Sequence, residues 1–210
     1  MKKFRLKVWG DFACFTRPEM KVERVSYDVM TPSAARAIFE AILWKPEIEW
    51  HIERIDILNP IKWINLRRNE LDNCKCGKNS TGIFVEEKRV QRAGLFLKDV
   101  SYVIQGHFTL KECAEQNNTA KKYEEMFVRR ASQGQCFMQP YLGCREFAAH
   151  FELVKDDETL QPLASLNLDM GWMLFDLDFS QNEISPKFFK ASIQEGILNI
   201  PAKNSAEVKG

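Results

Sequence analysis

The sequence is poor in histidine and has no long uninterrupted apolar run. Its 210 residues include three histidines, so each can be weighed individually. No window approaches the roughly 18 consecutive apolar residues that a membrane span requires. The start, MKKFRLKVWGDF, interleaves charged and apolar residues unlike a secretion signal, and the six cysteines are scattered. We therefore expect a cytoplasmic protein with reduced cysteines and no membrane partner.

Several motifs of nucleotide and metal chemistry are also missing. No P-loop or GxGxxG occurs and no Ser-His-Asp order stands out, so nucleotide hydrolysis and acyl transfer have no local support. Cys74 and Cys76 form one C-x-C pair, whereas a structural zinc usually takes four ligands from two such pairs. We expect no metal site and no cofactor.

The net charge of +1 conceals an uneven distribution. Residues 151–183 carry eight acidic side chains and one basic one, a local charge of −7, so the rest of the chain is basic. Such polarity allows a basic face for a polyanion, although a solvated surface with ordinary charge fluctuation explains it equally well.

The periodicity predicts a mixed α and β domain. Phe4, Leu6 and Val8 alternate with basic residues, as in a half-buried strand with a basic outer face. Thr31 as N-cap and Pro32 at the first helical position begin a helix over 32–44. Further strands are expected at 49–58, which residues 61–70 would extend, and at 100–108 and 148–154, with a second helix over 119–133.

This order of strand, helix, strand, strand, helix, strand is that of a ferredoxin-like (RRM-like) α+β domain. After it, residues 170–179 and a hairpin that turns at Glu195 and Gly196 predict an added antiparallel β-sheet. We therefore predict a ferredoxin-like domain at 1–155, with a loop insertion near 70–95, and a C-terminal β-sheet extension at 156–210.

Aromatic and basic residues are interleaved in three places, which is typical of single-stranded RNA binding. These are Tyr123 with Lys121, Lys122, Arg129 and Arg130; Phe96 with Lys88, Arg89, Arg92 and Lys98; and Trp63 with Lys62, Arg67 and Arg68. Each group alone also fits a solvated face, but together with the ferredoxin-like order they favour RNA.

The histidines differ in their surroundings. His51 and His150 lie between apolar residues and fit half-buried neutral rings in strands. His107 follows Gly106 in the strand VIQGHFTL, and a glycine inside a strand allows a ligand or another backbone to approach closely. A packed or surface histidine remains the alternative for His107.

Three segments resemble one known family: YDVMTPSAARAIFEAILWKP, QGHF and RRASQGQCFMQPYLGCREF. With a helix ending in W-K-P and an L-G-x-R-E loop after a basic helix, the chain resembles, over roughly residues 1–200, the subtype I-C (d-type) form of the fifth CRISPR-associated protein, in the RAMP superfamily. The resemblance implies a metal-independent endoribonuclease that cuts the repeat of precursor CRISPR RNA. It also implies that the protein stays on the 5′ handle as a subunit of the type I-C interference complex, and it leaves duplex DNA open as a further partner.

The resemblance implies cleavage by the RNA's own 2′-hydroxyl, leaving a 2′,3′-cyclic phosphate, at a site of one tyrosine, one lysine and one histidine. The histidine corresponds to His107, as general acid or base. The tyrosine position falls at Leu43, and the lysine position at Gln105 or Gly106, so two of three residues depart.

Other residues could replace the missing pair. The candidates are Tyr27, Lys45 and Tyr102 for catalysis, Trp44 with Lys45 to shape the site, and Lys121, Lys122, Arg129, Arg130 and Arg145 to hold RNA. The two departures leave a rival reading open, a non-catalytic subunit that binds the 5′ handle, and a third, a ferredoxin-like regulatory or small-molecule protein.

Overall fold

The computed structural model describes residues 2–20, 22–71, 84–111, 119–155, 157–179 and 184–210. The Cys74 and Cys76 pair lies outside these ranges. Within them the elements, in chain order, are β1 (Phe4–Ala13), α1 (Pro32–Ile42), β2 (Ile48–Ile57), β3 (Trp63–Leu71), α2 (Val85–Lys88), β4 (Arg89–Leu110), α3 (Ala120–Ser132), β5 (His150–Leu153), β6 (Leu168–Asp178), β7 (Ser185–Gln194) and β8 (Ile197–Asn199).

One antiparallel sheet of eight strands organises the described part of the chain. Its order is β5-β1-β4-β2-β8-β7-β6, and β3 pairs with β4 outside this path. The predicted C-terminal strands β6 to β8 are present and continue this sheet, because β8 pairs with β2. The predicted hairpin turn is confirmed, since Glu195 and Gly196 link β7 to β8 and both have positive φ.

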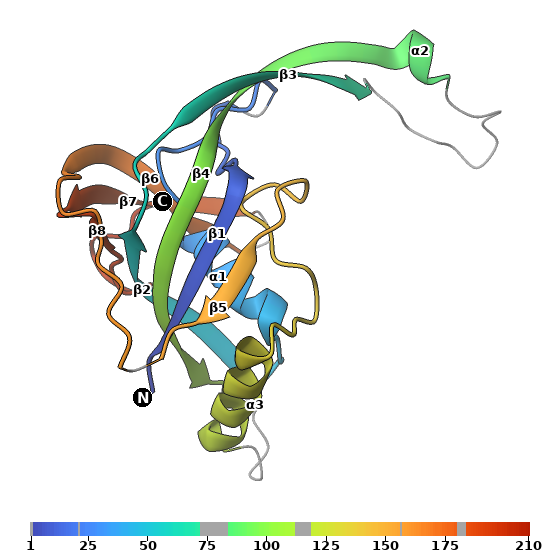
Figure 1. Cartoon of the computed structure of the whole chain (residues 1–210). Coiled ribbons are helices and arrows are strands. Elements are labelled where there is room, and N and C mark those ends of the chain that lie inside the picture. Colours follow the sequence, from blue (N-terminus) through green and yellow to red (C-terminus); the bar gives the residue numbers. More distant parts are fainter. Residues whose placement is uncertain (1, 21, 72–83, 112–118, 156, 180–183) are drawn as a thin grey trace.

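The second and third strands differ from their predicted bounds. Residues after Pro60 do not extend β2 but form β3, which pairs with β4 from Trp63 opposite Leu97 to Leu71 opposite Arg89. The strand expected at 100–108 begins at Arg89 instead. In Figure 1, β3 and the first half of β4 leave the body of the protein as a curved arm that ends in α2. Residues 85–95 of this arm, which were expected to belong to a loop insertion, form α2 and the start of β4.

Helix α1 begins as predicted and ends two residues early. Thr31 Oγ1 accepts a hydrogen bond from Ala34 N at 3.3 Å, and Pro32 occupies the first turn. The carbonyls at the end of the helix accept hydrogen bonds from side chains outside it. Arg130 Nη1 donates to Ile42 O, and Trp50 Nε1 donates to Leu43 O, both at 2.9 Å. These bonds replace the next helical turn and stop α1 at Ile42.

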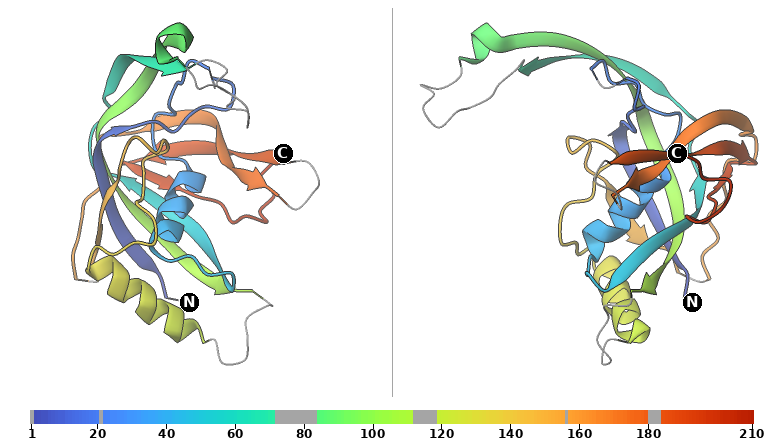
Figure 2. Two further views of the ribbon diagram at one scale, coloured as in Figure 1. Left: turned by 90° about the vertical axis from the view of Figure 1, so that its right-hand side faces the viewer. Right: turned by 180° about the vertical axis from the view of Figure 1, so that it is seen from behind.

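Both long helices bury the same face of the sheet. Phe39 of α1 and Phe127 of α3 each contact Trp50 of β2, with ring centroids 4.8 Å apart in both cases. Phe4 of β1 and Phe108 of β4 complete this aromatic core. On its other side α1 contacts β6, so the helix lies between β2 and the C-terminal strands (Figure 2). Because side chains alternate along a strand, the residues next to Trp50 in β2 and next to Phe108 in β4 face the other side of the sheet, away from the two helices.

Candidate active site

Two of the three histidines meet on neighbouring strands. His51 of β2 and His107 of β4 are directly opposite in the antiparallel ladder, and their rings stack with centroids 5.3 Å apart and an interplanar angle of 28°. Gly106 lets the strands approach here, because a Cβ at that position would lie 2.7 Å from His51 O. The glycine that drew attention to His107 in the sequence thus belongs to the contact between these strands.

His107 lies against a carboxylate. Its Nδ1 is 3.0 Å from Glu53 Oε1, but the angles are not those of a hydrogen bond, so this buried nitrogen has no hydrogen-bond partner among the residues that the structure describes. Lys3 forms an ion pair with Glu53 at 2.7 Å, and Gln105 Nε2 donates to it at 3.2 Å. Burial raises the pKa of Glu53, but these two donors and the nearby charges outweigh it and hold that pKa below its ordinary value. Glu53 is therefore an anion that lies directly beside the His107 ring.

His51 lies in surroundings that favour its neutral form. Its Nε2 is 2.9 Å from Thr109 Oγ1. Burial is the largest cause of a lowered pKa at His51, and the charge of Glu49 opposes it. Positive charge at His107 and on nearby basic residues lowers the pKa further. The surroundings of His51 therefore favour its neutral form.

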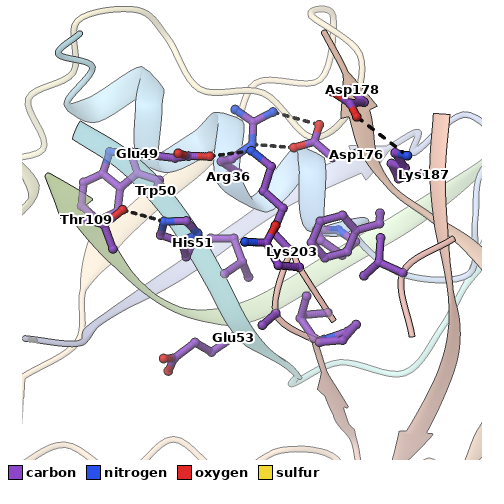
Figure 3. Close-up of a pocket in the computed structure, with 18 of the residues that line it drawn as sticks. Arg36, Glu49, Trp50, His51, Glu53, Thr109, Asp176, Asp178, Lys187 and Lys203 are labelled. Atoms are coloured by element: carbon purple, nitrogen blue, oxygen red, sulfur yellow. Dashed lines mark hydrogen bonds and ion pairs between the residues drawn. The ribbon is translucent and has the colours of Figure 1, made fainter. Parts of the chain in front are cut away.

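Both histidines line a cavity of about 840 Å³ at the edge of β2. β8 pairs with β2 only from Arg54 to Asp56, so the first half of β2 borders the cavity. The other walls come from α1, the end of β4, β6 and residues 200–204. Figure 3 shows His51 and Glu49 from β2 pointing toward this space, with Arg36 of α1 beyond them.

Ion pairs hold the walls of the cavity together. Arg36 makes two hydrogen bonds to Asp176 of β6, Nε to Oδ2 at 2.9 Å and Nη2 to Oδ1 at 3.0 Å. Lys203 pairs with Glu49 at 2.6 Å (Figure 3). These contacts connect α1, β2 and the C-terminal segments around one space, where two imidazoles and several cations are available for acid–base chemistry on a polar ligand.

The tyrosines proposed as substitutes lie elsewhere. Tyr27 and Tyr102 are each 2% exposed in the hydrophobic core, and neither lines the cavity. Burial raises the pKa of both phenols. The Tyr27 hydroxyl instead accepts a hydrogen bond from Leu174 N. Leu43, where the resemblance leads one to expect a tyrosine, is fully buried. These placements give neither phenol a route to a substrate beside His107.

The remaining candidates lie on another part of the surface. Trp44, 57% exposed, and Lys45 follow the end of α1 and do not line the cavity. Lys121, Lys122 and Arg129 are exposed on α3, and Arg145 is exposed in the loop before β5. Arg130 differs, because its guanidinium donates to the end of α1. The structure thus brings His107 together with none of these residues.

The residues that do accompany His107 went unrecognised in the sequence. His51, Glu53 and Glu49 alternate with Trp50 and Ile52, so period two was the available signal that all three share a face. That this face meets His107 depends on the pairing register of two distant strands.

The side of β1 that faces away from the aromatic core carries the row of basic residues predicted from the alternation of apolar and basic residues in the sequence. Lys3, Arg5 and Lys7 are exposed or half-buried, and Lys7 lies 5.3 Å over the Trp9 ring. Trp9 in turn stacks on His150 of β5, with centroids 5.7 Å apart. This row and ring pair form a basic, aromatic surface beside Gln105 and His107, because β1 pairs with β4.

Among the described residues, no group of three or more histidine, cysteine, aspartate or glutamate side chains is placed to hold a metal ion. Within the same ranges, no helix has the length and apolarity to cross a membrane.

Comparison with known proteins assigns the chain to a family. Residues 4–201 match the Cas5d family of CRISPR-associated proteins. The chain is 47% identical over 99% of its length to the CRISPR pre-crRNA endoribonuclease Cas5d of Mannheimia succiniciproducens, covering 98% of that protein. It is 43% identical to the protein of the same name from Thermus thermophilus, with 99% and 95% of the two chains covered.

Two solved structures share the fold. One is described as a CRISPR-associated protein, with a TM-score of 0.75 and 22% identity over 100% of this chain and 97% of the other. The second, SMU1763c from Streptococcus mutans, has a TM-score of 0.73 and 23% identity over the same shares. With the family match over nearly the whole chain, the protein belongs to the Cas5d family of CRISPR-associated proteins.

Proposed function

We propose that this protein is an endoribonuclease that cuts the repeat of precursor CRISPR RNA, with His107 in the reaction as a proton-transfer group. The observation that carries the proposal is that His107 lines the cavity at the edge of β2, beside a second histidine and a carboxylate. The two relatives named above, 43% and 47% identical, carry the name of such an enzyme.

The proposed reaction is attack by a 2′-hydroxyl on the adjacent phosphate. The O2′–P bond forms as the P–O5′ bond breaks, and the products are a 2′,3′-cyclic phosphate and a 5′-hydroxyl. One group must take the proton from O2′ and another must give a proton to O5′. Cations stabilise the extra negative charge on the phosphate oxygens, and the candidates are Lys3, which pairs with Glu53, and Lys203, which pairs with Glu49. Since the nucleophile belongs to the RNA, no metal is needed to activate water.

We propose two RNA-binding regions. The first is the basic row of β1 with the stacked rings of Trp9 and His150, where a base could stack and phosphates could pair with lysine. The second is the exposed basic surface of α3 with Trp44 and Arg145. The 5′ handle would remain bound there after cleavage, in a complex with the other type I-C subunits.

We assign the ferredoxin-like order to β1, α1, β2, β4, α3 and β5. The sheet order β5-β1-β4-β2 supports it, because the fourth, first, third and second strands of that motif lie in this sequence across its sheet. In this assignment residues 1–155 form the ferredoxin-like domain and 156–210 the C-terminal extension. We also propose a cytoplasmic location, because the RNA substrate would be found there.

A second function is favoured by one observation. The family's tyrosine and lysine positions hold buried Leu43 and either Gln105 or Gly106, so neither supplies its expected group. A non-catalytic subunit that only binds the 5′ handle would tolerate these changes.

Cleavage of the protein's own repeat RNA distinguishes the two functions. The purified protein is incubated with end-labelled repeat RNA in EDTA, and we expect a single cut that leaves a 2′,3′-cyclic phosphate. His107→Ala should reduce the rate about 10²–10⁴-fold while RNA affinity and the unfolding midpoint stay unchanged. Tight binding without any cut would favour the handle-binding subunit, and duplex DNA of the same sequence serves as the competitor for RNA specificity.

A further inference from the structure

We propose that His51 is the second proton-transfer group of the cleavage site, acting as the general base on the 2′-hydroxyl while His107 acts as the general acid on the 5′-oxygen. This inference rests on the proposed endoribonuclease function and names the residue that replaces the group missing at Leu43 and at Gln105 or Gly106.

The pairing of the strands brings the two rings to one place. They are opposite in the ladder, stack with centroids 5.3 Å apart, and line the same cavity. Because stacked rings leave no room between them, the scissile phosphate would lie across their edges facing the cavity. Each ring then has one nitrogen within the hydrogen-bond reach of about 2.6–3.2 Å that proton transfer needs.

The surroundings divide the two roles. Glu53 Oε1 lies 3.0 Å from His107 Nδ1, so the carboxylate occupies the side of that nitrogen and leaves Nε2 as the nitrogen that would give a proton to O5′. His51 has a lowered pKa because of burial, so its neutral form is favoured near neutral pH. Neutral imidazole is the form that accepts a proton.

Every packed element presents a charged or polar group to His51. These groups are Glu49 on β2, His107 and Thr109 on β4, Arg36 on α1 and Lys203 in the C-terminal segment. Glu49 alone favours the protonated ring, and it is itself paired with Lys203 at 2.6 Å. The protonated form that His51 acquires in the reaction is therefore only partly stabilised, which helps it to release the proton afterwards.

The contact with Thr109 is compatible with the tautomer that the mechanism requires. When His51 Nε2–H donates to Thr109 Oγ1, 2.9 Å away, Nδ1 carries the lone pair. His51 Nδ1 would then take the proton from O2′ as the O2′–P bond forms. His107 would give its proton to O5′ as the P–O5′ bond breaks. One proton enters the site and one leaves, so the pair returns to its starting state after proton exchange between the rings or with water.

The test uses repeat RNA with sulfur in place of the bridging 5′-oxygen at the cut. A thiolate leaves without a general acid, so His107→Ala should cut this RNA within about tenfold of the wild-type rate although it cuts normal RNA about 10²–10⁴-fold more slowly. Loss of the base is not relieved by sulfur, so His51→Ala should be slow on both RNAs.

His51→Gln separates catalysis from structure, because glutamine can hydrogen-bond Thr109 but cannot act as a base at neutral pH. We expect it to fold and bind RNA as the wild type does and to cut as slowly as His51→Ala. Wild-type rates for both His51 variants would overturn the inference while leaving the proposed function intact. Relief of His51→Ala but not of His107→Ala by sulfur would overturn the assignment of roles. Absence of cutting by the wild type would overturn the proposed function and this inference together.

Discussion

His51 and His107 stack directly opposite each other across β2 and β4, with ring centroids 5.3 Å apart. At this separation, positive charge on one ring disfavours positive charge on the other. The pair is therefore best suited to carry one positive charge at a time.

The pH dependence of cleavage should report His51. Its pKa is lowered by burial, so we expect the acidic limb of the rate profile to have its midpoint below about 6.5, the ordinary value for histidine. Removing the charge of Glu49, which raises the pKa, should move that limb to lower pH in Glu49→Gln. Glu86→Gln, the same change on α2 at the end of the arm, should leave it in place. Movement to higher pH in Glu49→Gln would contradict this reading.

Gly106→Ala should both destabilise the protein and slow cleavage. The new Cβ would lie 2.7 Å from His51 O and 3.2 Å from Ile52 Cδ1, so β2 must shift away from β4. Overpacking of this kind costs about 1–3 kcal/mol, measurable by urea unfolding. Gly10→Ala is the comparison, because its Cβ would lie closest to a side-chain atom, Leu142 Cδ1 at 2.6 Å, while the nearest backbone atom, Ala148 O, is 3.1 Å away instead of 2.7 Å. Equal losses in the two variants would mean that backbone contact is not the cause.

Asp176→Asn should loosen the connection between α1 and β6. Arg36 makes its two hydrogen bonds to Asp176 with only 28% and 21% of the two side chains exposed. Allowing for that exposure, we expect a loss of about 1–3 kcal/mol in the free energy of unfolding. Glu40→Gln, which removes the other partner of Arg36 within one helix, should cost about 0.3–0.5 kcal/mol. A larger effect of Glu40→Gln would reverse the importance of the two contacts.

Two adjacent arginines of α3 should respond differently to alanine. Arg130 Nη1 donates to Ile42 O at the end of α1, so Arg130→Ala should lower the free energy of unfolding by about 1–3 kcal/mol. Arg129 is exposed, so Arg129→Ala should leave stability unchanged. If α3 holds RNA, Arg129→Ala should weaken RNA binding and reduce the salt slope of log K by about 0.7. Unchanged affinity and slope would remove Arg129 from the RNA surface.

The sequence predicted those parts of the fold that depend only on residues close together in the chain, such as a helix start and a tight turn. Thr31 and Pro32 specify the start of α1, and the turn at Glu195 and Gly196 needs only its own backbone. The end of α1 could not be predicted, because its last carbonyls are taken by Trp50 and Arg130 from elsewhere in the chain. Arg130 was likewise grouped with the predicted RNA-binding residues. A cluster of basic residues along the chain does not show which of them forms a hydrogen bond within the protein, as Arg130 does with Ile42 O.

The candidate site was predicted only in part for the same reason. His107 stood out through Gly106 and the family resemblance, but nothing along the chain relates it to His51, 56 positions earlier. Their contact follows from the register of β2 on β4, and moving that register by one residue would turn one histidine toward Phe39 and the core. Buried Tyr27 and Tyr102 were chosen for nearness in the sequence, which did not carry over into space.

Strand β4 connects the arm to the histidine pair through 22 residues from Arg89 to Leu110, with one irregular residue, Asp99, at positive φ. A residue added to or removed from its middle would reverse which side every later side chain faces and would send His107 into the aromatic core. Matched changes at the tip, one residue in β3 for each in β4, would leave that facing intact. The reach of the arm can therefore vary during evolution while the cleavage chemistry stays fixed, so long as the changes are confined to the far end of the hairpin.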